Sequence, residues 1–223
     1  MYARGLSARD IEDALFEATG DEVLSKNAVS EVTEILNDEF EAFQNRDLSS
    51  FQVEYLFLDA VYESIQRLTG LDRGILCAWW ILRDGRKVFI HLAVGNKESY
   101  QDWLSFIRDM VKRGLCIPTT ITSNGAPRLI KAIEAAFALS PRIRCWFHKM
   151  QNLMEKVPSE AWPEAKAELI GMKDAKDYQT GLMLSQEFVA KYRDLFTLLA
   201  ACFQDDLEAS VNHLKAPTLT AGL

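Results

Sequence analysis

The chain has 223 residues, of which 48% are hydrophobic and 26% are charged, a composition that excludes a disordered or fibrous protein. Its formal net charge of −7 argues against a surface that coats nucleic acid all over, but it allows a local basic face. The scattered Cys77, Cys116, Cys145 and Cys202 predict free thiols, and no apolar run reaches membrane-spanning length, so a soluble, cytoplasmic protein with no membrane partner is expected.

The first 45 residues predict two helices. Ile11, Leu15 and Phe16 recur at helical spacing before Gly20, and a second short helix is expected after Ser25. Two short helices joined by a turn resemble a helix-turn-helix, and a plain helical hairpin is the alternative. The polar stretch that follows predicts a domain boundary.

Three strands are expected next. Residues 53–60 are apolar on both alternating faces, which predicts a central strand buried on both sides. Residues 74–82 and 86–94 form two further apolar runs, and Asp84-Gly85 between them is a strong hairpin signal. These runs predict an antiparallel meander.

Helices and strands then alternate. The predicted elements are a helix over residues 96–113, a strand over 119–122, a helix over 126–139, a strand over 142–147 and helices over 148–213. Three antiparallel strands followed by alternating helices and strands give the order of an RNase H-like domain. The predicted fold class is therefore α/β, with an RNase H-like mixed sheet, a helix-turn-helix-like N-terminal segment and C-terminal helices.

Asp59 and Asn124 are the first candidate site residues. Asp59 ends an apolar central strand, where a charge is costly unless it is solvated, paired or bound to a metal. Asn124 ends the fourth strand, which adjoins the first in this fold, so a carboxylate there would complete a metal-binding pair. The residue is a neutral amide, however, and Asn-Gly is also a common turn dipeptide.

The junction after the fifth strand holds the other candidates. Cys145 and His148 form a Cys-x-x-His motif, which is half of a zinc site or a buried cysteine beside a histidine that starts a helix. Arg142, Arg144 and Lys149 form a local basic cluster around them. This cluster either contacts a phosphate backbone or is the solvated start of a helix.

Taken together, these segments resemble the Mutator family of insertion-sequence transposases, which carry a DDE catalytic triad on an RNase H-like fold. The Cys-x-x-His segment together with the strand that ends at Asp59 is the most specific part of the match. The resemblance extends from residue 2 to about Lys215. The matching segments are Tyr2–Ser7, Tyr55–Asp59, Ser123–Gly125, Leu129–Glu134 and Arg144–Asn152.

The resemblance implies DNA strand cleavage and strand transfer by two Mg²⁺ (or Mn²⁺) ions that three carboxylates hold. Asp59 would be the first catalytic and metal-binding carboxylate, and Asn124 stands where the family has its second aspartate. The family's third carboxylate is a glutamate in a Thr-Asn-x-Ile-Glu-like motif. Asp205, Asp206 and Glu208 do not match that motif.

The resemblance also divides the chain. Residues 1–45 would be the helix-turn-helix-like DNA-binding segment, residues 51–157 the RNase H-like catalytic core, and residues 158–215 a helical insertion. Residues 216–223 are expected to be an unstructured tail that looks like readout after a frameshift or a premature stop.

DNA at the terminal inverted repeats of the element is the implied partner, together with a second copy or a full-length transposase. The expected DNA contacts are Arg4, Arg9, Lys26, Arg142, Arg144 and Lys149.

The expected function is thus that of a truncated, catalytically defective transposase. A non-catalytic DNA-binding or interaction fragment that inhibits the full-length transposase is the main alternative. Two further alternatives are a protein that zinc stabilises through Cys145 and His148, and an RNase H-type nuclease acting on RNA–DNA hybrids.

Overall fold

The computed structural model describes residues 13, 16–17, 25–51, 53–61, 73–96 and 99–215. Most of the first predicted helix, the tail 216–223, Arg4 and Arg9 lie outside the described residues, and so does the side chain of Lys26. In the part that is described, no helix is long and apolar enough to cross a membrane.

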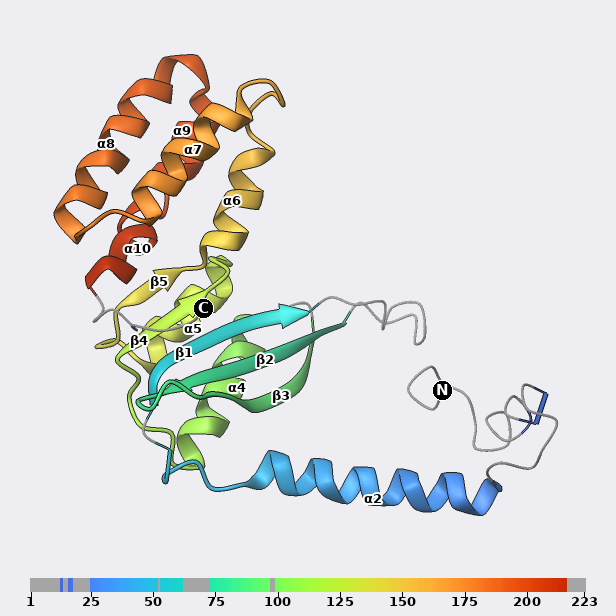
Figure 1. The fold of residues 1–223 in the computed structure, drawn as a ribbon. Coiled ribbons are helices and arrows are strands. Elements are labelled where there is room, and N and C mark those ends of the chain that lie inside the picture. Colours follow the sequence, from blue (N-terminus) through green and yellow to red (C-terminus); the bar gives the residue numbers. More distant parts are fainter. Residues whose placement is uncertain are drawn as a thin grey trace.

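A five-stranded mixed sheet forms the centre of the molecule (Figure 1). Its order is β3-β2-β1-β4-β5, with β1, β2 and β3 antiparallel and with β4 and β5 parallel to β1. The predicted antiparallel meander is confirmed, and the arrangement is compatible with an RNase H-like fold. The strands are β1 (Val53–Val61), β2 (Arg73–Leu82), β3 (Lys87–Asn96), β4 (Thr120–Ser123) and β5 (Arg142–Arg144).

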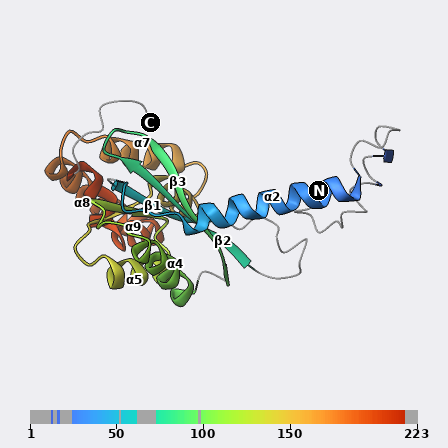
Figure 2. The same cartoon turned by 90° about the horizontal axis from the view of Figure 1, so that it is seen from below.

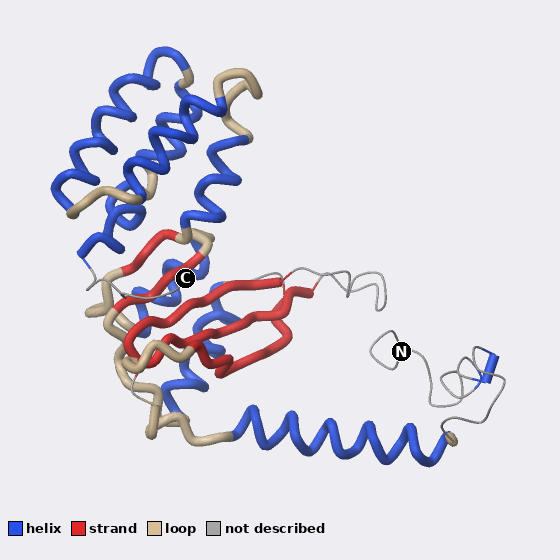
Figure 3. The backbone as a smooth tube through the Cα atoms, in the orientation of Figure 1, coloured by secondary structure: helices blue, strands red, loops and turns tan. Residues whose placement is uncertain are grey.

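Helices α4 and α5 cover one face of the sheet, and a group of helices from α6 to α10 stands beyond β5 (Figures 1 and 3). The eight α-helices of the described residues are α2 (Lys26–Asn45), α4 (Tyr100–Lys112), α5 (Pro127–Ala136), α6 (Trp146–Met154), α7 (Trp162–Lys173), α8 (Tyr178–Leu195), α9 (Thr197–Gln204) and α10 (Leu207–Val211); the 3₁₀ helix η2 (Asn212–Lys215) follows them.

The main core lies between the sheet and helices α4 and α5. Leu56 and Leu58 of β1 point into it, and Trp103 and Ile107 of α4 face them, all four at most 2% exposed. On the opposite face of β1, Tyr55 is also buried, as expected for a strand in the middle of a sheet. Burial of each large apolar side chain contributes about 2 kcal/mol, so this core fixes β1 and the residues at its end.

A second core lies within the helical group. It joins Leu153 of α6, Leu169 of α7, Phe188 of α8 and Phe203 of α9, all at most 1% exposed. Helix α6 therefore packs with the helices that follow it, although the sequence division at residue 157 placed it with the sheet.

Helix α2 differs from its expected form. It is 20 residues long rather than short, because Ser25 caps its start and no helix breaker follows until Asn45. Its first turns extend away from the sheet (Figures 1 and 2), so Val32 and Leu36 are at least 50% exposed. Its last turn is anchored on β3, where the Gln44 side chain donates to the Leu92 carbonyl at 3.1 Å.

The fifth strand is shorter than predicted. It ends at Arg144 rather than at Phe147: the Cys145 amide donates the last bond of the ladder, to the Ser123 carbonyl at 2.9 Å, and α6 begins directly afterwards at Trp146. The motif around Cys145 is consequently a strand-to-helix junction.

His91 of β3 is a buried titratable group. Its ring stacks on Phe106 with centroids 4.4 Å apart, and its Nε2 lies 3.3 Å from a carboxylate oxygen of Asp109. Burial, helped by the nearby Arg113, lowers the pKa of His91 to about 4, and Asp109 only partly opposes this. Between the unfolded pKa of about 6.5 and this value, the unfolded chain binds a proton that the folded chain does not.

We therefore expect stability to fall as the pH is lowered from about 6.5 toward 4. The contribution of His91 to this loss is up to about 3 kcal/mol, since one pKa unit corresponds to about 1.4 kcal/mol. Urea unfolding at several pH values should show a steeper decline for the wild-type chain than for His91→Gln. Parallel declines would contradict the buried neutral state of His91.

Candidate functional site

Asp59 and Asn124 lie at the same edge of the sheet. Strands β1 and β4 run parallel, and their last registered pair is Leu58 with Ser123. Asp59 and Asn124 are the next residues on each strand, so the carboxyl ends of two central strands present both side chains together. In an α/β sheet, this edge is where ligands commonly bind.

The Asp59 carboxylate is accessible to solvent. Its side chain is 42% exposed, and Oδ1 accepts a hydrogen bond from the Ala60 amide at 2.9 Å. Its other oxygen, Oδ2, lies 3.9 Å from Nε2 of His148. The apolar strand therefore delivers a charged group to the surface without burying it.

Asn124 builds the turn that follows β4. Its Oδ1 accepts from the Ala126 amide at 3.0 Å, and Gly125 has a φ of +82°, which favours glycine. Pro127 then occupies the first turn of α5. The amide oxygen of Asn124 is thus engaged in local structure.

The start of α6 lies beside this edge. The bond from the Cys145 amide to the Ser123 carbonyl ties the start of α6 to the end of β4, and His148 lies in the first turn of that helix. Within the described residues, no group of three or more His, Cys, Asp and Glu side chains can hold a metal ion. The described residues therefore give no support to a zinc site built on Cys145 and His148.

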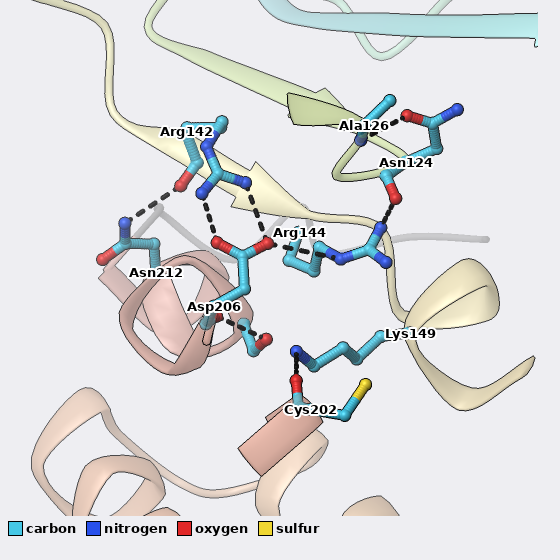
Figure 4. Close-up of polar contacts among 9 residues, drawn as sticks. Asn124, Ala126, Arg142, Arg144, Lys149, Cys202, Asp206 and Asn212 are labelled. Carbon is cyan, nitrogen blue, oxygen red and sulfur yellow. Dashed lines mark hydrogen bonds and ion pairs between the residues drawn. The ribbon is translucent and has the colours of Figure 1, made fainter. Parts of the chain in front are cut away.

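Two of the predicted DNA-contacting cations pair with Asp206 (Figure 4). The Asp206 carboxylate is 12% exposed and accepts two hydrogen bonds from Arg142, of which the one from Nη1 is 3.0 Å long. Nε of Arg144 lies 3.3 Å from the same carboxylate, and the Arg144 side chain is only 4% exposed. Burial lowers the pKa of Arg144, and Asp206 opposes that shift.

Lys149 is buried as well. It is 2% exposed, and its Nζ donates to the Cys202 carbonyl at 2.7 Å and lies 5.5 Å from the centroid of the Phe203 ring. Burial lowers its pKa. The sequence predicts that Arg144 and Lys149 contact phosphate. In the structure, both side chains are instead buried and paired within the protein, because α9 and the turn that follows it cover them.

Arg144 also touches the turn at the candidate site. Its Nη1 donates to the Asn124 carbonyl (Figure 4). Its guanidinium also lies so close to Gly125 that an added Cβ would be 2.5 Å from Cζ. One buried arginine therefore connects the turn after β4 with Asp206 of the helical group.

Helix α2, which lies in the predicted N-terminal DNA-binding segment, is acidic. After Lys26, no basic residue follows in this helix, and five acidic residues do. A helix that lies in a DNA groove needs cations against the phosphates, so α2 does not suit that role. The acidic residues are Glu31, Glu34, Asp38, Glu39 and Glu41.

The sequence profile described as "Transposase, Mutator family" matches residues 1–220. The chain belongs to this family of transposases. It is similar, at 30% identity over 97% of its own length and 67% of the relative's, to the transposase of insertion element IS6120 from Mycolicibacterium smegmatis.

Two other transposases that the chain is similar to are longer. The transposase of IS1081 from Mycobacterium tuberculosis is 30% identical over 96% of this chain and 49% of its own length. The transposase of IS256 in Tn4001 from Staphylococcus aureus is 26% identical over 98% of this chain and 59% of its own length. The chain thus spans about half to two thirds of these relatives.

The magnesium pair that the family resemblance implies can be compared with the donor groups at this edge. Asp59 offers a carboxylate, whereas Asn124 offers a neutral amide whose oxygen already accepts a hydrogen bond. Mg²⁺ favours carboxylate oxygens and phosphates, so these described side chains do not fit a two-ion centre.

Sequence reasoning missed two residues of this region. It did not place His148 beside Asp59, and it treated Asp206 only as a failed match to the third carboxylate. The position of His148 directly after the strand that neighbours β4 was a usable signal. Asp206 and Arg142 are 64 positions apart, and no local pattern connects them.

The pairing of Asp206 with two arginines leads to a stability prediction. We expect Asp206→Asn to destabilise the protein by about 3 kcal/mol, because it leaves the buried Arg144 charge without its partner. The neighbouring Asp205 is exposed, so Asp205→Asn should change stability by no more than about 0.5 kcal/mol. Chemical unfolding of both variants measures this difference, and equal effects would refute the role of Asp206.

Two glycines, Gly85 and Gly125, allow a test of the close contact between Gly125 and the Arg144 side chain. Gly85 and Gly125 both have positive φ, but a Cβ at Gly85 would meet nothing within 4 Å, whereas one at Gly125 would strike Arg144. Gly85→Ala should therefore cost about 1 kcal/mol, and Gly125→Ala about 3 kcal/mol. Thermal unfolding compares them, and a smaller cost for Gly125→Ala would show that Arg144 moves freely.

Proposed function

We propose that this chain is the core of an insertion-element transposase that binds DNA but does not cut it by itself. The observation that carries the proposal is the edge at the ends of β1 and β4, where Asp59 stands beside an amide at position 124. The family match over residues 1–220 and the strand order both support an RNase H-like core for it.

The side chain at position 124 supports the proposal that the chain does not cut DNA by itself. Asparagine has the shape of aspartate but no negative charge, and the charge is what attracts a hard divalent cation. Its Oδ1 also holds the Ala126 amide, as an aspartate oxygen would in the same turn. Asn124 thus preserves the fold of the site and removes part of its chemistry.

DNA is the proposed substrate because relatives at 30% identity are transposases of insertion elements. Since Arg144 and Lys149 are buried, we expect other exposed cations to neutralise the phosphates. A cytoplasmic location and association with another transposase chain complete the proposal.

A second candidate function follows from the same residue. A copy that binds the element or a full-length transposase and cannot cut would compete with active copies. The neutral Asn124 beside an accessible Asp59 favours this inhibitory role over that of an RNase H-type nuclease, which would need the same carboxylates.

Two measurements on the full chain test the proposal. A randomised 30-base-pair fluorescent duplex pool should bind with an affinity that falls linearly with salt on logarithmic axes, as for any contact with phosphates. Supercoiled plasmid incubated with Mg²⁺ or Mn²⁺ should stay unnicked. Absence of DNA binding at low salt would refute the DNA-binding part.

The Asp59→Asn variant is the control for cutting. Plasmid nicking by the wild-type chain that disappears in Asp59→Asn would show that the centre is complete despite Asn124, and would overturn the proposed deficiency. Nicking that persists in Asp59→Asn would come from a contaminating nuclease and would leave the chain itself without cutting activity, as proposed.

A further inference from the structure

Helix α2 carries an apolar stripe that the described part of the molecule leaves open to solvent. Val32, Leu36 and Phe40 follow one another at intervals of four residues, and Ile35 lies beside Leu36, so the four side chains share one side of the helix. They are between 40% and 58% exposed, because the first turns of α2 extend away from the sheet (Figures 1 and 2). A contiguous exposed apolar patch on a helix marks a contact with another molecule.

The charges of α2 select the kind of partner. The helix turns by about 100° per residue, which places four of its five acidic residues on the side opposite Leu36. These four are Glu31, Glu34, Asp38 and Glu41. Their charge repels a phosphate backbone or an anionic membrane, whereas another protein helix can pack on the apolar side without meeting them.

We propose that the stripe binds the same stripe on a second copy of this chain. About a two-fold axis that relates two antiparallel helices at Leu36, this residue meets its own copy, and Val32 meets Phe40 of the second copy, so a small side chain faces a large one. Glu39, which borders the stripe, then lies opposite Thr33 of the second copy and not opposite another acid. The inference deepens the proposed function, because it assigns a surface and a geometry to the association with another transposase chain.

The N-terminal segment of the same chain fits the stripe less well than a second copy does. Residues 1–24 contain six acidic and two basic residues, so their net charge repels the acidic helix. Phe16, an apolar residue of this segment that the structure describes, is 57% exposed and therefore does not cover α2. A second copy keeps four of its acidic residues on the far side of its own α2.

The anchoring of α2 on the sheet sets the direction of the pairing. Phe43 of the last turn stacks on Phe89 of β3 with ring centroids 5.6 Å apart, and Phe40 stacks on Phe43. The sheet therefore adjoins the C-terminal end of the stripe (Figure 2). Two parallel helices would bring both sheets to this end, where they would compete for the space beside Phe43, whereas two antiparallel helices place the sheets at opposite ends.

Sedimentation velocity of the full chain without DNA tests the inference. The interface is small, so we expect a dimer with a dissociation constant on the order of 10 µM. Leu36→Glu should weaken the dimer at least about tenfold, because two like charges then meet on the axis. Leu198→Glu is the matched control, since Leu198 is a 70% exposed apolar residue of α9 outside the stripe, and it should leave the dimer unchanged.

A charge swap at the axis separates a broken contact from a misfolded chain. Leu36→Glu chains mixed with Leu36→Lys chains should associate at least about tenfold more tightly than either variant does alone, because opposite charges then face each other. Circular dichroism should show both variants folded, since residue 36 is exposed. No gain in association on mixing would refute a contact of residue 36 with its own copy.

Disulfide trapping tests the direction of the pair. In a Cys116→Ser background, which removes an exposed thiol, Val32→Cys chains mixed with Phe40→Cys chains should form a disulfide-linked pair under mild oxidation. Linked pairs within Val32→Cys chains alone would indicate parallel helices and overturn the geometry. A wild-type chain that stays monomeric at about 200 µM would overturn the whole inference. Because no DNA is present in these experiments, that result would leave the proposed DNA binding to its own test.

Discussion

The carboxylate of Asp206 holds the two parts of this protein together. It is nearly buried and accepts hydrogen bonds from Arg142, while Arg144 lies against the same group. A buried guanidinium is costly without a partner, so the arginines of β5 require the helical group to stay in place. Because Arg144 also supports the turn after β4, the geometry of the candidate site depends on a residue far along the chain.

Because of this pairing, basic side chains near the site are buried and are not presented on the surface. Arg144 and Lys149, which flank the Cys-x-x-His motif, are buried and make their contacts inside the protein. What the edge presents outward is a carboxylate and an imidazole from His148. The edge therefore presents one carboxylate and one imidazole in place of the basic cluster that the sequence predicts.

Asn124 has a structural role in the turn after β4 that does not depend on a charge. Either Asn or Asp can accept a hydrogen bond from the Ala126 amide, so the strand, the turn and α5 can form with either residue at position 124. Membership of the Mutator transposase family follows from the whole chain, whereas the proposed loss of cutting rests on the missing charge at one residue.

The sequence by itself determined the features that neighbouring residues control. Asp84-Gly85 specified the hairpin, and Ser25 specified the start of α2. The apolar run before Asp59 specified the central strand. These features could be predicted because turn chemistry and periodicity act over a few residues. Only the tertiary structure decided that α2 extends away from the sheet, that Arg142 and Arg144 share Asp206, and that His148 faces Asp59. Those outcomes depend on contacts between elements that are distant in the sequence, and no local pattern encodes them.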